Sequence, residues 1–123
     1  MLSQSLIYYN KKYSNLFRIC YLFECQVPLE LCDYIDASEQ NLDLLIDAGI
    51  FICDFGLLTA QNEFVKDWIM HAYSYNSLSI QNTARRLLND SKKITYNIGY
   101  VNIYRVLGYN KQALLLLEKN INI

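Results

Sequence analysis

Apolar residues recur every three or four positions through most of the chain, the spacing that gathers them on one face of an α-helix. In residues 5–26 this spacing predicts one helix, or two helices joined near Asn10. Pro28 suits the first turn of a helix, because the N–H that proline lacks has no helical partner there. A short helix is therefore expected over residues 29–35.

The next part of the chain combines a capping residue with a glycine stop. Ser38 is expected to cap a helix that runs to Ala48 and ends at Gly49. Residues 50–58, which contain Asp54-Phe55-Gly56, form either a strand-like loop or one more helical turn.

Four further helices are predicted in the second half of the chain. They are a helix over residues 60–75 capped by Thr59, a helix capped by Ser79 that reaches Asp90, a helix over residues 95–107 that stops at Gly108, and a helix over residues 111–119 capped by Asn110.

Together these patterns predict an all-α protein of six to eight short helices, packed as antiparallel hairpins in a bundle or a short solenoid. The composition agrees, because four glycines and one proline in 123 residues are too few for a turn-rich β fold. The length is that of one domain, so a single helical domain over residues 1–123 is expected.

Composition and cysteine usage favour a cytoplasmic protein. With 53% apolar and 19% charged residues the chain is globular, and its start carries no basic stretch ahead of an apolar one. The apolar segment 16–27 is interrupted by Arg18 and Glu24 and is too short to span a bilayer. No C-x2-C pair occurs among the four cysteines, which are therefore expected to be buried thiols: Cys20, Cys25, Cys32 and Cys53.

Charge is distributed unevenly. The first 18 residues carry three basic and no acidic side chains, residues 19–65 carry nine acidic and no Lys or Arg, and the remainder carries eight basic and three acidic. A formal net charge of −1 therefore conceals a strongly acidic middle segment.

An acidic stripe within that segment gives the candidate partner-binding residues. Glu39, Asp43 and Asp47 are spaced by four on the expected Ser38-capped helix, and like charges at this spacing cost a few tenths of a kcal/mol per pair. The stripe is either a solvated helix face or a surface that attracts a basic partner. The candidate residues are Asp33, Asp36, Glu39, Asp43 and Asp47.

Residues 42–49, Leu-Asp-Leu-Leu-Ile-Asp-Ala-Gly, resemble the second helix of an ankyrin repeat, and residues 28–32 resemble the opening of its first helix. Residues 115–120 are similar, with Asn120 at the family's closing glycine. A tetratricopeptide hairpin is the competing resemblance, through Trp68, Ala72, Tyr75, Ala84 and Leu88. Either resemblance implies helical repeats that bind other proteins.

No residue pattern indicates catalysis, a cofactor or a metal. His71 is the only histidine, and nothing selects a cysteine to pair with it, so a helix-surface or half-buried role is expected. Asp54-Phe55-Gly56 spells the magnesium motif of kinases, but the other kinase motifs are missing. The chain is therefore predicted not to be an enzyme.

The sequence favours an inhibitor or immunity-type protein that blocks a basic protein, such as a nuclease toxin, with its acidic face. An adaptor built from degenerate helical repeats is the alternative. A nucleic-acid-binding regulator that uses the basic C-terminal half, with Arg85, Arg86, Lys92 and Lys93, is a third hypothesis.

Overall fold

The computed structural model describes residues 2–34, 39–90 and 98–121, and the side chains of residues 2–31, 41–90 and 98–119. These residues form seven α-helices, one 3-10 helix and three strands. In chain order they are α1 (Leu2–Lys12), α2 (Ser14–Leu22), β1 (Gln26–Pro28), the 3-10 helix η1 (Leu29–Tyr34), α3 (Glu39–Asp47), β2 (Phe51–Asp54), β3 (Leu57–Ala60), α4 (Glu63–Ala72), α5 (Leu78–Asp90), α6 (Ile98–Val106) and α7 (Asn110–Ile121). The prediction of a mostly helical protein is confirmed.

The all-α prediction is wrong in one respect, because the three strands form a small antiparallel sheet in the order β1-β3-β2. Asp54 pairs with Leu57, which leaves Phe55 and Gly56 as a two-residue turn between β2 and β3. Both turn residues have positive φ, 50° and 77°, the geometry whose twist suits a tight hairpin. This turn reverses the chain within residues 50–58, for which the sequence allowed either a strand-like loop or a helical turn.

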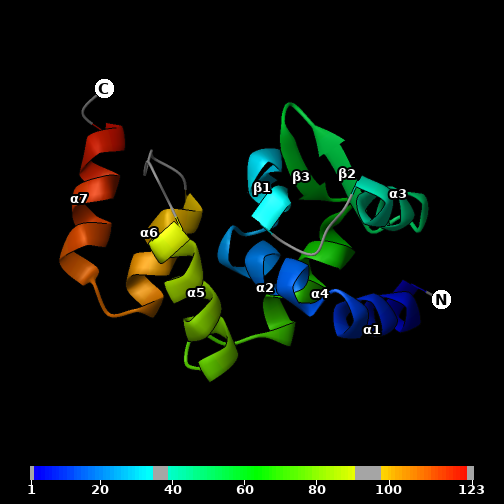
Figure 1. Ribbon diagram of the computed structural model, residues 1–123, viewed down its shortest axis with the longest axis horizontal. Coiled ribbons are helices and arrows are strands. Elements are labelled where there is room, and N and C mark those ends of the chain that lie inside the picture. The colour runs from blue at the N-terminus through cyan, green and yellow to red at the C-terminus, as the bar shows by residue number, and fades with distance from the viewer. Residues whose placement is uncertain (1, 35–38, 91–97, 122–123) are drawn as a thin grey trace.

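The central helix is α2, which packs against α4, α5, α6 and β1 (Figure 1). Six of its nine residues are buried. The ring of Phe17, which has no exposed surface, lies edge-on to the rings of Phe51 in β2 and Trp68 in α4, at centroid distances of 5.6 and 6.5 Å. The predicted helix break near Asn10 lies instead at Tyr13, between α1 and α2.

The C-terminal end of α2 is a left-handed turn without glycine. Glu24 and Cys25 have φ angles of 52° and 61°, and the Cys25 N–H donates to the carbonyl of Cys20 at 2.7 Å. Asn102 of α6 is buried and donates from Nδ2 to the carbonyl of Leu22 at 2.7 Å and to Oε2 of Glu24 at 3.0 Å. The Asn102 amide thus gives a partner to a carbonyl at the helix end, and it links α6 to α2.

Helices α5, α6 and α7 form a layer beside α2, with α7 as its outermost helix (Figure 1). Gly99 lets α6 approach the end of α2, since a Cβ at this position would lie 2.1 Å from the ring of Phe23. Arg18 of α2 donates from Nε to Oγ1 of Thr83 in α5 at 3.1 Å. The layer is therefore joined to the central helix by a close steric fit and by polar contacts.

Both predicted glycine stops are confirmed. Gly49 and Gly108 follow the ends of α3 and α6 with φ angles of 77° and 81°. After each glycine the next N–H donates back to the helix, from Ile50 to the Leu45 carbonyl at 3.1 Å and from Tyr109 to the Tyr104 carbonyl at 2.7 Å. These bonds complete the glycine-based helix ending that the sequence indicated.

Three predicted caps are misplaced, and one of them, Asn110, is itself the first residue of α7. Thr59 lies within β3, and the strand runs to Ala60, so α4 is capped instead by Asn62, whose Oδ1 accepts from the Val65 N–H at 3.0 Å.

At α5, Ser79 lies inside the helix. Oγ of Ser77 accepts from the Ile80 N–H at 3.4 Å, so Ser77 takes the capping role. The predicted cap Ser38 lies outside the described residues.

Candidate functional site

The structure places two of the five candidate residues on one exposed helix surface. Asp43 and Asp47 lie one turn apart on α3, and both are exposed. Asp33 belongs to η1 and Glu39 begins α3, but their side chains are not among those described, and Asp36 lies outside the described residues. Of the three residues in the predicted stripe, the structure thus describes the side chains of Asp43 and Asp47.

A third carboxylate, which the candidate residues did not include, lies on the neighbouring strand. α3 packs beside β2, and Leu45 of α3 is fully buried (Figure 1). Cys53 in β2, which was predicted to be buried, is exposed. Its partial desolvation, and then the negative charge of Asp43, raises the pKa of its thiol. Asp54 ends β2 and is exposed. We call Asp43, Asp47 and Asp54 the acidic region.

Phe55 projects from the hairpin tip directly after the acidic region. It is 96% exposed, the largest value among the large apolar side chains described. Its φ of 50° lies in the left-handed region, where a residue other than glycine costs about 1–2 kcal/mol. The tip is held in place, because the N–H of Leu29 donates to the carbonyl of Gly56 at 3.0 Å. The backbone conformation at Phe55 therefore lowers stability, and its exposed side chain contributes nothing to the hydrophobic core.

This tip was not predicted from the sequence, because residues 50–58 allowed a strand-like loop or a helical turn and Asp54-Phe55-Gly56 was weighed as a kinase motif. The available signal was a glycine at the second turn position between two short apolar runs, which favours a two-residue hairpin. Phenylalanine at the first position hid that signal, since asparagine, aspartate or glycine is usual there.

Basic side chains lie mostly away from the acidic region. Lys66 is the one Lys or Arg between residues 26 and 72, and it is half-buried. Lys11 and Lys12 of α1 are exposed on the same side of α2 as α3, and Lys12 lies over the rings of Tyr8 and Tyr13, at 5.8 and 5.5 Å from their centroids. In Figure 1 the layer α5–α7 lies on the opposite side of α2 from α3 and the hairpin. The exposed basic side chains of that layer are Arg85, Arg86, Arg105, Lys111 and Lys119.

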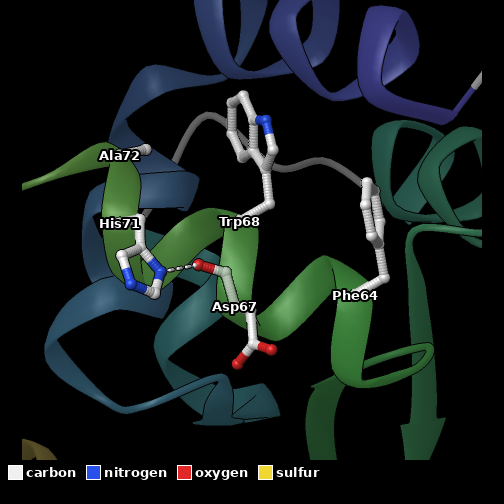
Figure 2. A pocket seen from close by; sticks show the side chains of 5 residues that line it. All are labelled: Phe64, Asp67, Trp68, His71 and Ala72. Atoms are coloured by element: carbon white, nitrogen blue, oxygen red, sulfur yellow. Dashed lines mark hydrogen bonds between the residues drawn. The ribbon is translucent and has the colours of Figure 1, made fainter.

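His71 does not form a catalytic pair with the carboxylate beside it. It lines a shallow hollow of about 400 Å³ on the outer side of α4, together with Phe64, Asp67, Trp68 and Ala72. Figure 2 shows Nδ1 of His71 turned to the backbone carbonyl of Asp67, at 2.7 Å, whereas the carboxylate of Asp67 points away. The ring is therefore held by the backbone of its own helix and not by the Asp67 carboxylate.

A second hollow, of about 340 Å³, is polar and lies between the end of α2 and the start of α4, with Glu24, Cys25, Glu63 and Lys66 among its lining residues. Burial raises the pKa of the Cys25 thiol to about 12, against a smaller lowering by Lys66. The thiol is therefore protonated at neutral pH, whereas a cysteine nucleophile reacts as the thiolate.

The described residues form neither a metal-binding cluster nor a membrane-spanning helix. Within residues 2–31, 41–90 and 98–119, no three His, Cys, Asp or Glu side chains come together as metal ligands. None of the helices in the described ranges is both long and apolar enough to cross a membrane. Comparison with protein-family models, curated proteins and solved structures finds no match to this chain.

Proposed function

We propose that this protein binds and blocks another protein, as an inhibitor of the immunity type, by covering the substrate-binding surface of a basic partner such as a nuclease toxin domain. The observation that carries the proposal is the separation of charge across the molecule. Exposed carboxylates lie on α3 and the hairpin, and most exposed basic groups of the described residues, those of α5–α7, lie on the far side of α2, whereas Lys11 and Lys12 lie on α1.

The electrostatic part of the proposal concerns Asp43 and Asp47. Two carboxylates one helical turn apart repel each other by a few tenths of a kcal/mol. Positive charges on a basic partner would attract both carboxylates and offset this repulsion. Such a surface also steers association, an effect that salt screens over about 8–10 Å at physiological ionic strength. Affinity and association rate should therefore both fall as salt rises.

The apolar part of the proposal concerns Phe55. Interfaces draw most of their binding energy from a few aromatic or arginine side chains that enter a desolvated pocket. Phe55 is presented on a hairpin that is paired on one side and braced by Leu29, so little conformational freedom is lost when it binds. Asp54 precedes Phe55, and exposed Glu30 follows the bracing Leu29. These carboxylates suit an apolar pocket rimmed by lysine or arginine.

The experiment reverses the described part of the stripe, as Asp43→Lys/Asp47→Lys. A basic protein encoded beside this chain in its genome is purified, and binding is measured by isothermal titration calorimetry at two salt concentrations. Affinity should fall by about 2 kcal/mol or more, the size typical of hot-spot residues. Helix content should stay unchanged, because both side chains are exposed.

The matched control is Arg85→Glu/Arg86→Glu on α5, which likewise reverses two exposed charges. These two arginines are adjacent in the sequence. This variant should bind as the wild type does. Equal loss from both double variants, or salt-independent binding that survives the acid reversal, would contradict the proposal.

A labelled DNA or RNA probe separates the proposal from a nucleic-acid regulator. Binding of the probe that is lost in Arg85→Glu/Arg86→Glu would favour the basic half as the functional surface. Ancestry from ankyrin or tetratricopeptide repeats would favour protein binding as well, and it stays a prediction.

A further inference from the structure

The outermost helix, α7, carries two apolar stripes, and one of them is left exposed. Ala113 and Leu116 are 2% and 8% exposed, in the packing of α7 on α6. Leu114 and Leu115 are 56% and 52% exposed. A helix that served only to cover α6 would need apolar residues on one stripe, with polar residues on the other.

The exposed stripe ends in opposite charges. Lys111, Leu114, Leu115 and Glu118 follow the spacing i, i+3, i+4 and i+7, which places them on one face of a helix, and all four are exposed. The sequence of properties along this face is positive, apolar, apolar, negative. It is therefore complementary to itself when reversed.

We propose that this stripe pairs two copies of the chain through antiparallel α7 helices related by a twofold axis. The axis passes between Leu114 and Leu115, so Leu114 of one copy meets Leu115 of the other, and Lys111 of each copy meets Glu118 of its partner. A parallel pair in the same register would instead bring Lys111 against Lys111 and Glu118 against Glu118. Charge complementarity thus favours a second copy of the chain as the partner, with its α7 helix antiparallel to the first.

The surface beside the stripe has room for such a pairing. A hollow of about 200 Å³ is bordered by Leu115 and Leu116 of α7 and by Tyr104 of α6, with Gln112 and Lys119 at its polar side. A leucine from the second copy is of a size to enter it. One pair of helices buries less area than a stable dimer needs, so the dimer is weak and reversible, with a Kd of roughly 10–500 µM.

The experiment measures mass by sedimentation equilibrium over a concentration series, using the full chain. The wild type should pass from monomer to dimer within that range. Leu114→Gln/Leu115→Gln should remain monomeric at the highest concentration, with unchanged circular dichroism, because both side chains are exposed in the monomer. A wild type that stays monomeric at roughly 500 µM, or a double variant that dimerises as the wild type does, overturns the proposal.

Charge exchange tests the direction of the pairing. Lys111→Glu and Glu118→Lys each place like charges together at two points of the dimer and should weaken it about tenfold. Combining the two substitutions restores opposite charges and should restore the wild-type Kd. Failure of the combined variant to recover, or single variants that bind as the wild type does, overturns the antiparallel pairing. Leu78→Gln, at the 67% exposed start of α5, is the matched control and should leave the Kd unchanged.

Discussion

Phe55 and the leucines of α7 are both exposed, yet the backbone beneath them differs. Phe55 lies at a two-residue turn with a φ of 50°, which phenylalanine adopts only at a cost. Leu114 and Leu115 lie in a regular helix, where their backbone needs no unusual geometry. A costly aromatic tip is suited to insertion in a pocket, whereas a periodic stripe is suited to another helix. The two regions thus favour two kinds of partner, a basic protein for the hairpin and a second copy for α7.

The same two regions depend on one helix. α2 meets α4 through the edge-on contact between Phe17 and Trp68, and it meets α6 through the close approach of Phe23 and Gly99. Changes at these two contacts should therefore show whether the hairpin side and the C-terminal layer unfold together or separately.

The largest effect is expected from Phe17→Ala. Removing this fully buried ring should lower the free energy of unfolding by about 3–5 kcal/mol, since it leaves a cavity between α2, β2 and α4. Chemical denaturation followed by circular dichroism and by Trp68 fluorescence measures it. Coincident transitions would indicate one cooperative unit. A loss below 1 kcal/mol would contradict the packing described for Phe17.

Phe55→Asn should separate binding from folding. Asparagine tolerates the left-handed turn, so the free energy of unfolding should rise by about 0.5–1 kcal/mol. Affinity for the basic partner should fall by about 2 kcal/mol or more because the aromatic anchor is lost. Thermal denaturation and calorimetry measure the two changes.

The control for Phe55→Asn is Leu78→Asn, another exposed apolar side chain but on the C-terminal layer. It should leave affinity unchanged. If Phe55→Asn binds like the wild type while Asp43→Lys/Asp47→Lys does not, the acidic region functions without the anchor.

Gly99→Ala should act on the other side of α2. Its Cβ would lie 2.1 Å from the Phe23 ring, and such overpacking costs about 1–3 kcal/mol in the free energy of unfolding. Repeating the substitution in a Phe23→Leu background should reduce the cost, because the smaller side chain leaves space. Equal costs in both backgrounds, or a gain from the higher helix propensity of alanine, would contradict the close approach of α6 to α2.

The sequence predicted those features that depend on local patterns. The stops at Gly49 and Gly108 follow from glycine's freedom to adopt positive φ, and the helices follow from apolar spacing. The pairing of β1 with β3 was missed because the two strands are distant in sequence, and their pairing depends on tertiary contacts. The caps at Thr59 and Ser79 were misplaced because β3 extends to Ala60 and α5 begins at Leu78, so other polar residues lie at the helix starts.

In the candidate site, too, some features follow from local sequence patterns and others depend on tertiary contacts. The helical period predicted that Asp43 and Asp47 share an exposed face. That Asp54 and Phe55 follow a strand packed beside this helix depends on β2 folding back beside α3, which no spacing in the chain encodes.

The smallest expected effect uses the Cys53 thiol as a probe of the acidic region. The Asp43 carboxylate helps to raise the pKa of this thiol, so Asp43→Asn should lower that pKa and increase the thiolate fraction at pH 8. Because alkylation requires the thiolate, labelling by iodoacetamide should become roughly two- to threefold faster, a change expected for an exposed charge in screening solvent. Mass spectrometry of the labelled peptides assigns the rate to Cys53. Glu118→Gln on α7 is the control and should leave the rate unchanged.

Salt and a second thiol complete this test. Raising the salt concentration should accelerate labelling of Cys53 in the wild type and have less effect in Asp43→Asn, because screening and substitution remove the same field. Cys25, buried and with its pKa raised to about 12, should stay unlabelled throughout at pH 8. Labelling of Cys25 at the rate of Cys53 would show local unfolding at the end of α2. An Asp43→Asn rate equal to that of the wild type would mean that Asp43 lies too far from Cys53 to raise the pKa of its thiol.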